Sequence, residues 1–598
     1  MTDAPTAAGT LAFVPGDLVI SLSGDGDGSG AYADNQAAPI TLEQIAPDGT
    51  LAGRLVLPQS ATVSNGVTSS AISGEYGSSS EGSLERSADG HSLVIAGYGV
   101  NAATFNAAPP ATYGTAALAQ TTSIPGGTLT AVTRVIADIR ADGSVDTSTA
   151  LYGVANTNNP RSAATVDGSS FYLSGQGVKG DATQGVFLAA DGATQATAID
   201  TSTDTRTLEI ANGQLIVSRD SKQGTGGTAN IATYGALPTT ATAPAILPGI
   251  SQTVTLTAAQ ANTVNAAAVG TAVHLSPENF FLADASTLYV ADAGNPKQGG
   301  PGDGGLQKWS LAGGAWHLDY TLSAGLGLVP DTASAGTTGL IGLAGTVTGD
   351  TVRLYATSAT IGDTDPTSLV AVTDTLSATT GAGETFATLV TAPADTNIRG
   401  VALAPTAPCY AAGTRLRTPD GERRVDDVRP GDTLLTAAGR HAPVRWVGHR
   451  RVRCHAHPAP DTVNPVRIHA HAFGPGLPAR DLLLSPEHAL FLGGALVPAG
   501  LLVDNRAVTR DTPAEVTYFH VELDRHDILL AEGLPAESYL DTGNRAQFAN
   551  APVTTLHASF APGHDAAEPC APLALHGPAL DAARATLAAF TPLDRAAG

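Results

Sequence analysis

The chain has 598 residues, 42% of them hydrophobic, and a net charge of −23. Because hydrophobic cores usually stop growing near ~250–300 residues, this length predicts at least two domains. The acidic excess disfavours nucleic acid and anionic membranes as partners, the three cysteines are too few for a disulfide framework, and no apolar run reaches the ~18 residues of a membrane span.

Charge and histidine are unevenly distributed along the chain. Residues 1–400 hold 13 Lys and Arg against 33 Asp and Glu, whereas the remainder has a net charge of only −3. Histidine divides the other way, since 12 of the 15 follow residue 400. These shifts predict a boundary near residue 400. Residues 1–12 have neither a basic start nor an apolar stretch, so no Sec-type signal is visible and export would need another route or an upstream start site.

The front part repeats one short pattern, an apolar strand that follows a Gly, Asp or Ser turn. The spacing of roughly 45–80 residues is close to that of propeller blades with inserted loops. One such unit cannot bury its apolar face alone, so the copies are expected to stack around a common axis in about seven blades. The copies lie at residues 16–21, 91–96, 169–174, 213–218, 286–291 and 350–355, with a weaker seventh at 398–403.

This front part, about residues 10–405, resembles bacterial extracellular seven-bladed β-propellers, in which a segment like 397–405 often ends the ring. An elongated β-sandwich array or a β-helix is the rival fold. We expect no cofactor and name no metal site: the Asp- and Gly-rich segments 24–29 and 299–305 lack the acidic twelfth position of an EF-hand, so loops are favoured over calcium sites. The resemblance implies an extracellular ligand, a glycan or a protein.

The back part has short strand-like runs bounded by turns, which predict half-buried antiparallel strands. Three ordered blocks stand out: CYAAGT at 409–414, SPEH at 485–488, and VTYFHVEL at 516–523 with His526 and Gly533 after it. A cysteine at the start of a compact β module, followed by Ser/Thr-x-x-His, suits a chain that attacks its own backbone, because the thiol takes the preceding carbonyl and the imidazole protonates the departing nitrogen.

Over about 140 residues, these blocks resemble the Hint domain, the fold shared by inteins and the hedgehog autoprocessing region, and most of all its bacterial stand-alone variety. The resemblance implies that Cys409 is the nucleophile, that His488 is the acid, and that Ser485 replaces the orienting threonine. His526 would assist. Cys454 and the histidines around it have irregular spacing, which favours a solvated loop over a metal site.

Two departures from the family pattern limit this implication. Inteins end with His-Asn followed by Cys, Ser or Thr, but the corresponding places hold Glu537 and Ser538, so asparagine cyclisation and ligation are not expected. The residue before the nucleophile is Pro408, whose ring stiffens the segment that must rearrange. We therefore expect cleavage at Pro408-Cys409 through a thioester, in a single turnover and without splicing.

The expected fold is all-β, with a propeller at 1–405, a Hint-like domain at 406–550, and an Ala- and Pro-rich tail at 551–598 that forms one short helix at 580–590 on an otherwise loose segment. The first hypothesis is a bacterial protein, exported or on the cell surface, with a ligand-binding propeller and a self-cleaving back end. The alternatives are an adhesin-like protein with an inert Hint fold, and a propeller enzyme with catalytic residues in its central channel.

Overall fold

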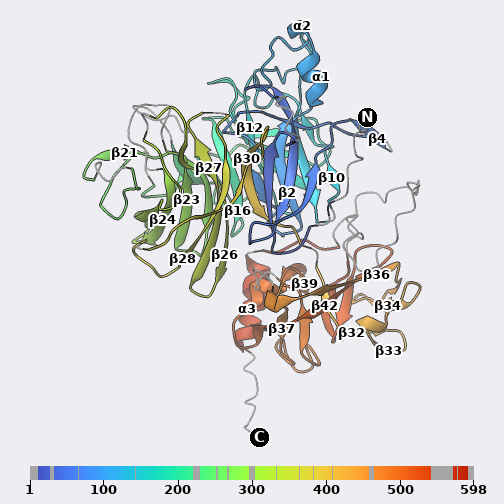
Figure 1. The fold of residues 1–598 in the computed structure, drawn as a ribbon. Coiled ribbons are helices and arrows are strands. Elements are labelled where there is room, and N and C mark those ends of the chain that lie inside the picture. The colour runs from blue at the N-terminus through green and yellow to red at the C-terminus, as the bar shows by residue number, and fades with distance from the viewer. Residues whose placement is uncertain are drawn as a thin grey trace.

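The computed structural model describes residues 11, 13–26, 32–64, 66–141, 143–219, 229–250, 253–264, 269–294, 304–330, 333–362, 364–381, 383–406, 408–456, 463–539, 570–575 and 577–589. The expected loop segments 24–29 and 299–305 lie partly outside them, as does most of the tail. Figure 1 shows two bodies, a larger one coloured blue to yellow and a smaller one coloured orange to red. Among the described residues, no helix combines the length and hydropathy that a membrane crossing needs.

The larger body is a β-propeller whose described residues form six blades. In four of them the strands follow one another in chain order, each antiparallel to the next. These blades are β12 (Pro160–Thr165), β13 (Ser170–Gly175), β14 (Gly185–Ala190) and β15 (Thr197–Asp200); β16 (Thr205–Ala211), β17 (Gln214–Arg219), β18 (Asn230–Thr233) and β19 (Ala245–Ile246); β22 (Pro277–Leu282), β23 (Thr287–Asp292), β24 (Gly305–Ala312) and β25 (Ala315–Leu322); and β26 (Thr337–Thr348), β27 (Thr351–Thr360), β28 (Ser368–Thr375) and β29 (Ala387–Thr391).

The other two blades share a sheet. One contains β7 (Leu84–Arg86), β8 (Ser92–Tyr98), β9 (Arg134–Arg140), β10 (Val145–Asp146) and β11 (Ala150–Leu151). The other contains β1 (Leu18–Ser23), β2 (Ala37–Ile45), β3 (Leu51–Val56) and β30 (Asn397–Leu403), and β6 (Ser73–Glu75) joins the two. Outside the blades lie the hairpins β4 (Thr62–Ser64) to β5 (Val67–Ser69) and β20 (Thr253–Thr255) to β21 (Ala272–His274), and the helices α1 (Ala102–Ala107) and α2 (Pro110–Tyr113).

The ring is closed by the last strand of the propeller. β30 pairs antiparallel with β1, so the innermost strand of the first blade comes from nearly 400 residues further along the chain. In Figure 1 the gold β30 lies among the blue strands. The innermost strands β30, β7, β12, β16, β22 and β26 contact one another in a closed circle. The pairing of β30 with β1 thus joins the two ends of the ring in one blade, while the inner edges of the blades meet around the centre.

The all-β propeller is confirmed, but the expected number of about seven blades is wrong for the described residues. Each of the first six sequence copies falls on the second strand of a different blade: β1, β8, β13, β17, β23 and β27. The seventh copy, 398–403, is β30, which pairs with the first copy. Seven copies therefore make six blades, because a copy count does not show that the two ends of the chain share one sheet.

Tight turns hold the blade strands in register. Asn212-Gly213 joins β16 to β17, and Gly313-Gly314 joins β24 to β25, as two-residue loops in which both residues have positive φ. Such loops match the twist of antiparallel strands and need residues that tolerate the left-handed region. The apolar side of each strand then faces the next blade, and the cores lie between blades.

The smaller body contains two six-stranded antiparallel sheets. The first has the order β36 (Trp446–Val452), β42 (Val516–Glu522), β31 (Tyr410–Ala411), β38 (Leu482–Leu484), β37 (Val466–Ile468) and β41 (Val508–Arg510). The second has the order β33 (Gly421–Arg424), β32 (Arg415–Thr418), β43 (Ile528–Ala531), β44 (Leu534–Glu537), β39 (Ala489–Leu492) and β40 (Ala495–Pro498). A hairpin, β34 (Thr433–Leu435) to β35 (His441–Pro443), and three short 3-10 turns, Val425–Asp427, Cys454–Ala456 and Ala499–Leu502, complete it.

The expected C-terminal helix is present as α3 (Pro578–Ala589), and it packs against the smaller body, whereas most of the tail around it lies outside the described residues. Leu580, Ala583 and Leu587, one face of the helix, are buried in the core of the smaller body. Their spacing of three and four residues puts them on one stripe. The helix is therefore part of the fold of the smaller body.

Candidate active site

Strand pairing around β31 brings three separated segments together. Tyr410 in β31 pairs with Leu484 of β38 on one side and with Phe519 of β42 on the other. In an antiparallel pair, the residue before one partner lies beside the residue after the other. Cys409 is therefore placed between Ser485 and His520. The register of one two-residue strand thus assembles the site.

Hydrogen bonds fix the backbone of Cys409. Its N–H donates to Oγ of Ser485 at 2.8 Å, and its carbonyl accepts from the N–H of Ser485 at 3.0 Å. The amide nitrogen of the Pro408-Cys409 bond is thus held by the hydroxyl that the sequence identifies as the orienting group.

The thiol of Cys409 contacts His520. Its Sγ lies 2.5 Å from Nε2 of His520, and both residues are buried, with 8% and 2% of their surface exposed. Burial raises the pKa of the Cys409 thiol, a shift that the nearby Arg450 opposes and Glu487 reinforces. Burial also lowers the pKa of His520 well below its usual range, aided by His488 and Arg450. The resting pair at neutral pH is a neutral thiol beside a neutral imidazole.

His520, which contacts the thiol, is a residue that the sequence analysis did not single out. It belongs to the third block, yet the assisting role was given to His526. The alternation along β42 is the signal that could have found it, because Tyr518, His520 and Glu522 share one face and all are buried. A period of two places a histidine on the face of Tyr518 and Glu522, but only the pairing with β31 shows what it meets.

His488 lies close to Cys409, beside Tyr410, the residue that follows it. Its ring packs against Tyr410 with centroids 4.3 Å apart, and its N–H donates to the carbonyl of Ser485 at 3.1 Å. Among the described residues, neither ring nitrogen has a hydrogen-bond partner. Burial lowers the pKa of His488 to about 4, although Glu537 opposes the shift. The imidazole is neutral at pH 7 and becomes a strong acid when protonated.

His526 is placed with Glu537 rather than with the thiol. Its Nε2 lies 3.6 Å from Oε2 of Glu537, and its Nδ1 accepts from the N–H of Cys570 at 3.1 Å. Burial alone would lower the pKa of His526, but Cys570 and Glu537 together raise it to about 10. Glu537, at a place where inteins carry a splicing residue, also accepts from the N–H of Ala489 at 2.6 Å. This carboxylate ties β44 to β39.

The propeller holds the segment before Pro408. Thr406 donates its N–H to the carbonyl of Gly90 at 2.9 Å, and its hydroxyl accepts from Arg86 at 2.8 Å. Arg86 also lies 3.8 Å from Glu487, inside the second block. The chain is therefore anchored on both sides of Pro408, by the propeller at Thr406 and by the smaller body at Cys409.

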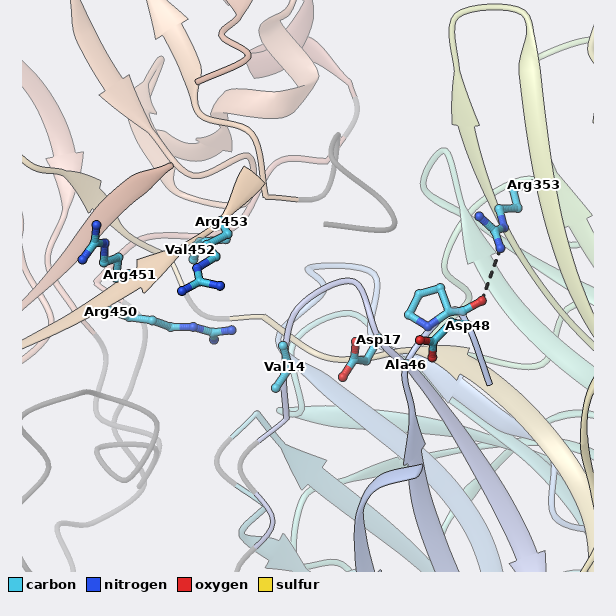
Figure 2. A pocket seen from close by; sticks show the side chains of 10 residues that line it. Val14, Asp17, Ala46, Asp48, Arg353, Arg450, Arg451, Val452 and Arg453 are labelled. Atoms are coloured by element: carbon cyan, nitrogen blue, oxygen red, sulfur yellow. Dashed lines mark hydrogen bonds between the residues drawn. The ribbon is translucent and has the colours of Figure 1, made fainter. Parts of the chain in front are cut away.

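A second contact between the bodies is electrostatic. A cavity of about 700 Å³ separates Asp17 and Asp48 of the propeller from Arg450 and Arg453 of β36 and the segment after it. Figure 2 shows Arg450 extending toward the propeller loop that carries Val14 and Asp17. Asp17 and Cys409 both act on Arg450, whose pKa burial lowers and these two groups raise. The propeller carboxylate Asp17 thus interacts with Arg450, the cation that lowers the pKa of Cys409.

Metal-binding residues do not cluster in this region. Among the described residues, no group of three or more His, Cys, Asp or Glu side chains is arranged to hold a metal ion. None of the three cysteines forms a disulfide bond, and Cys454 is buried among apolar residues near Cys409.

The comparison with known families agrees with this geometry. Residues 408–543 match the family model of the Hint domain. The Hint domain thus begins one residue before the nucleophile expected from the sequence. Two solved structures are similar to this part. The MchDnaB-1 intein has 19% sequence identity, covers 21% of this chain and 98% of its own, and gives a TM-score of 0.16. A bacterial intein-like domain from Clostridium thermocellum has 12% identity, covers 22% of this chain and 97% of its own, and gives a TM-score of 0.17.

The propeller part also has a structural likeness. An oligogalacturonate lyase from Vibrio parahaemolyticus is similar over 62% of this chain and 95% of its own, at 8% identity and a TM-score of 0.28. No curated protein sequence matches the chain.

Proposed function

We propose that the Hint domain cleaves its own chain once, at Pro408-Cys409, and releases the propeller. The observation that carries this proposal is the placement of Cys409 between Ser485 and His520, with the scissile nitrogen bonded to one and the sulfur in contact with the other. Intramolecular placement of a nucleophile can lower a barrier by about 7–11 kcal/mol. The family match of residues 408–543 supports autoprocessing as the class of reaction.

The first step is an N-to-S acyl shift. His520 takes the proton of the thiol as Sγ attacks the carbonyl carbon of Pro408. The bond from that carbon to the nitrogen of Cys409 breaks, and the nitrogen takes up one proton. The donor is the protonated form of His488, a minor form at pH 7 because its pKa is lowered, and it returns to the neutral imidazole when it gives up the proton. The thiol loses one proton and the amine gains one, so the step leaves a thioester with no net change in protonation.

The second step breaks the thioester without joining new flanks. Glu537 and Ser538 stand where splicing would need the dipeptide His-Asn. Both have structural contacts: Glu537 pairs with His526, and Oγ of Ser538 accepts from the N–H of Asp527 at 3.0 Å. No asparagine is available there to cyclise. A nucleophile such as water then releases residues 1–408 with a free carboxyl group.

Mass spectrometry of the purified full-length chain tests the proposal. Wild type is expected to yield fragments 1–408 and 409–598, and hydroxylamine is expected to speed their release by trapping the thioester. The Cys409→Ala variant is expected to stay intact. Wild type that remains uncut over days, with or without hydroxylamine, would instead favour an inert Hint fold in an adhesin-like protein, an alternative that the burial and raised pKa of the thiol support.

We also propose that the propeller is a binding module for a glycan or protein ligand outside the cell. Its acidic surface and its ring of six blades suit a soluble display of loops. Fractionation of a native bacterial culture tests the location, and a glycan array with residues 1–408, obtained by cleavage of the whole chain, tests the ligand class. Fragment confined to the cytoplasm contradicts the location, and an array without hits contradicts a glycan ligand.

A further inference from the structure

A cavity at the boundary of the two bodies contains the residue before the scissile bond. It measures about 500 Å³, and Pro408 lines it together with Asp89 and His91 from the propeller and His526 and Glu537 from the Hint domain. A nucleophile that opens a thioester at Pro408 has to approach from a space of this kind. The propeller forms one of its walls.

His91 is a rigidly held imidazole on that wall. Its backbone N–H donates to Oγ of Ser87 and to Oδ1 of Asp89, both at 3.0 Å, in a turn that just precedes β8. Its ring Nδ1 lies 3.2 Å from Oδ2 of Asp89. Its Nε2 is buried and has no hydrogen-bond partner among the described residues. Asp89 thus holds the neutral ring with its proton on Nδ1, which leaves Nε2 as an acceptor.

The charge of His91 reaches the cleavage site. It contributes to lowering the pKa values of His488 and His520. It also contributes to lowering the pKa of Glu537. An interaction with all three groups places His91 beside the Hint site, although its place in the chain is more than 300 residues before the nucleophile.

We propose that His91 is the general base for the second half-reaction, in which a nucleophile from the cavity opens the thioester. The proposal rests on the proposed cleavage at Pro408-Cys409. With water as the nucleophile, the oxygen bonds to the carbonyl carbon of Pro408 and one water proton moves to Nε2 of His91. The bond from that carbon to Sγ of Cys409 breaks, and the sulfur takes the proton that His520 received from it. The products are residues 1–408 with a carboxyl group and a chain that starts at Cys409.

This assignment makes the propeller part of the cleavage machinery instead of a passive cargo. Asp89 acts as a positioning residue, because it orients the ring without facing the thioester itself. A simple structural role for His91, as one polar contact at an interface, predicts something different: its loss would weaken the docking of the two bodies and slow both half-reactions alike.

The test separates the two half-reactions in the full-length chain. His91→Gln is compared with wild type and with His317→Gln, which removes an exposed histidine on the far strand β25 of another blade. Hydroxylamine in excess measures thioester formation, and release without it measures hydrolysis. Burial alone would lower the pKa of His91, but Asp89 raises it to about 8, so the assay is run at about pH 8.5.

His91→Gln is expected to form the thioester at the wild-type rate under hydroxylamine while spontaneous release falls by about 10²-fold or more. His91→Ala with added imidazole should recover release, and His317→Gln should match wild type. Equal loss of both rates, or no loss of release, overturns the proposal. If wild type itself forms no thioester that hydroxylamine traps, the proposed cleavage fails first, and that result is recognisable without any His91 variant.

Discussion

The contact between Cys409 and His520 makes a quantitative prediction for the first half-reaction. An ordinary thiol with a pKa near ~8.5 is only a few per cent ionised at pH 7. Burial raises the pKa of Cys409 further, and each unit lowers the thiolate fraction tenfold. The reaction therefore depends on removal of the proton as the sulfur attacks. The acceptor is Nε2 of His520, 2.5 Å away.

We expect His520→Ala to slow thioester formation by about 10²–10⁴-fold, which corresponds to roughly 3–5 kcal/mol in the barrier. The assay follows fragment 409–598 by mass spectrometry in excess hydroxylamine, so that hydrolysis does not limit the rate. His441→Ala is the control, since His441 is exposed on β35 of the same domain. Thermal unfolding of both variants shows whether the fold is kept.

A second signature distinguishes lost base catalysis from lost packing. Without the imidazole, the thiol must lose its proton to solvent before it attacks. The rate of thioester formation by His520→Ala should therefore rise about tenfold per pH unit between about pH 7 and pH 9. Wild type should depend on pH less steeply. A folded His520→Ala variant that forms the thioester within about threefold of the wild-type rate would refute the role of His520.

Three further predictions concern the groups around the thiol. Ser485→Ala leaves the buried N–H of Cys409 without its acceptor, so the free energy of unfolding should fall by about 1–3 kcal/mol and cleavage should slow. Chemical denaturation measures the loss against the control Thr512→Ala, a change at an exposed residue, and equal stability of the two variants would contradict the prediction. Arg450→Gln removes the cation that lowers the pKa of Cys409, so the pKa of the thiol should rise and cleavage at pH 7 should slow by up to about tenfold. Arg451→Gln, on the exposed side of the same strand, is the control and should not change the cleavage rate. His488 has a pKa of about 4 in the folded chain against 6.5 when unfolded, so as pH falls the unfolded chain takes up this proton first, and the folded state should lose about 3 kcal/mol of stability between pH 6.5 and pH 4. A His488→Gln variant should lose less stability over that range. Parallel curves of unfolding free energy against pH for the two proteins would count against the lowered pKa of His488.

The amino-acid sequence by itself carried the class of the fold and the position of the chemistry. Period-two alternation and turn residues indicate many short antiparallel strands, because side chains on a strand alternate between two faces. The blocks at Cys409 and at Ser485 to His488 are local patterns that carry their own chemistry, and the family match places the Hint domain over them. These are short-range features, which a linear reading can detect.

The tertiary structure decided everything that depends on pairing between distant segments. The number of blades follows from the register of β30 with β1, and the position of His520 beside the thiol of Cys409 follows from the register of β42 with β31. His91 lines the same cavity as Pro408 only because the propeller docks on the Hint domain. Strand register and domain docking are set by the sum of many long-range contacts, so no local pattern in the chain encodes them.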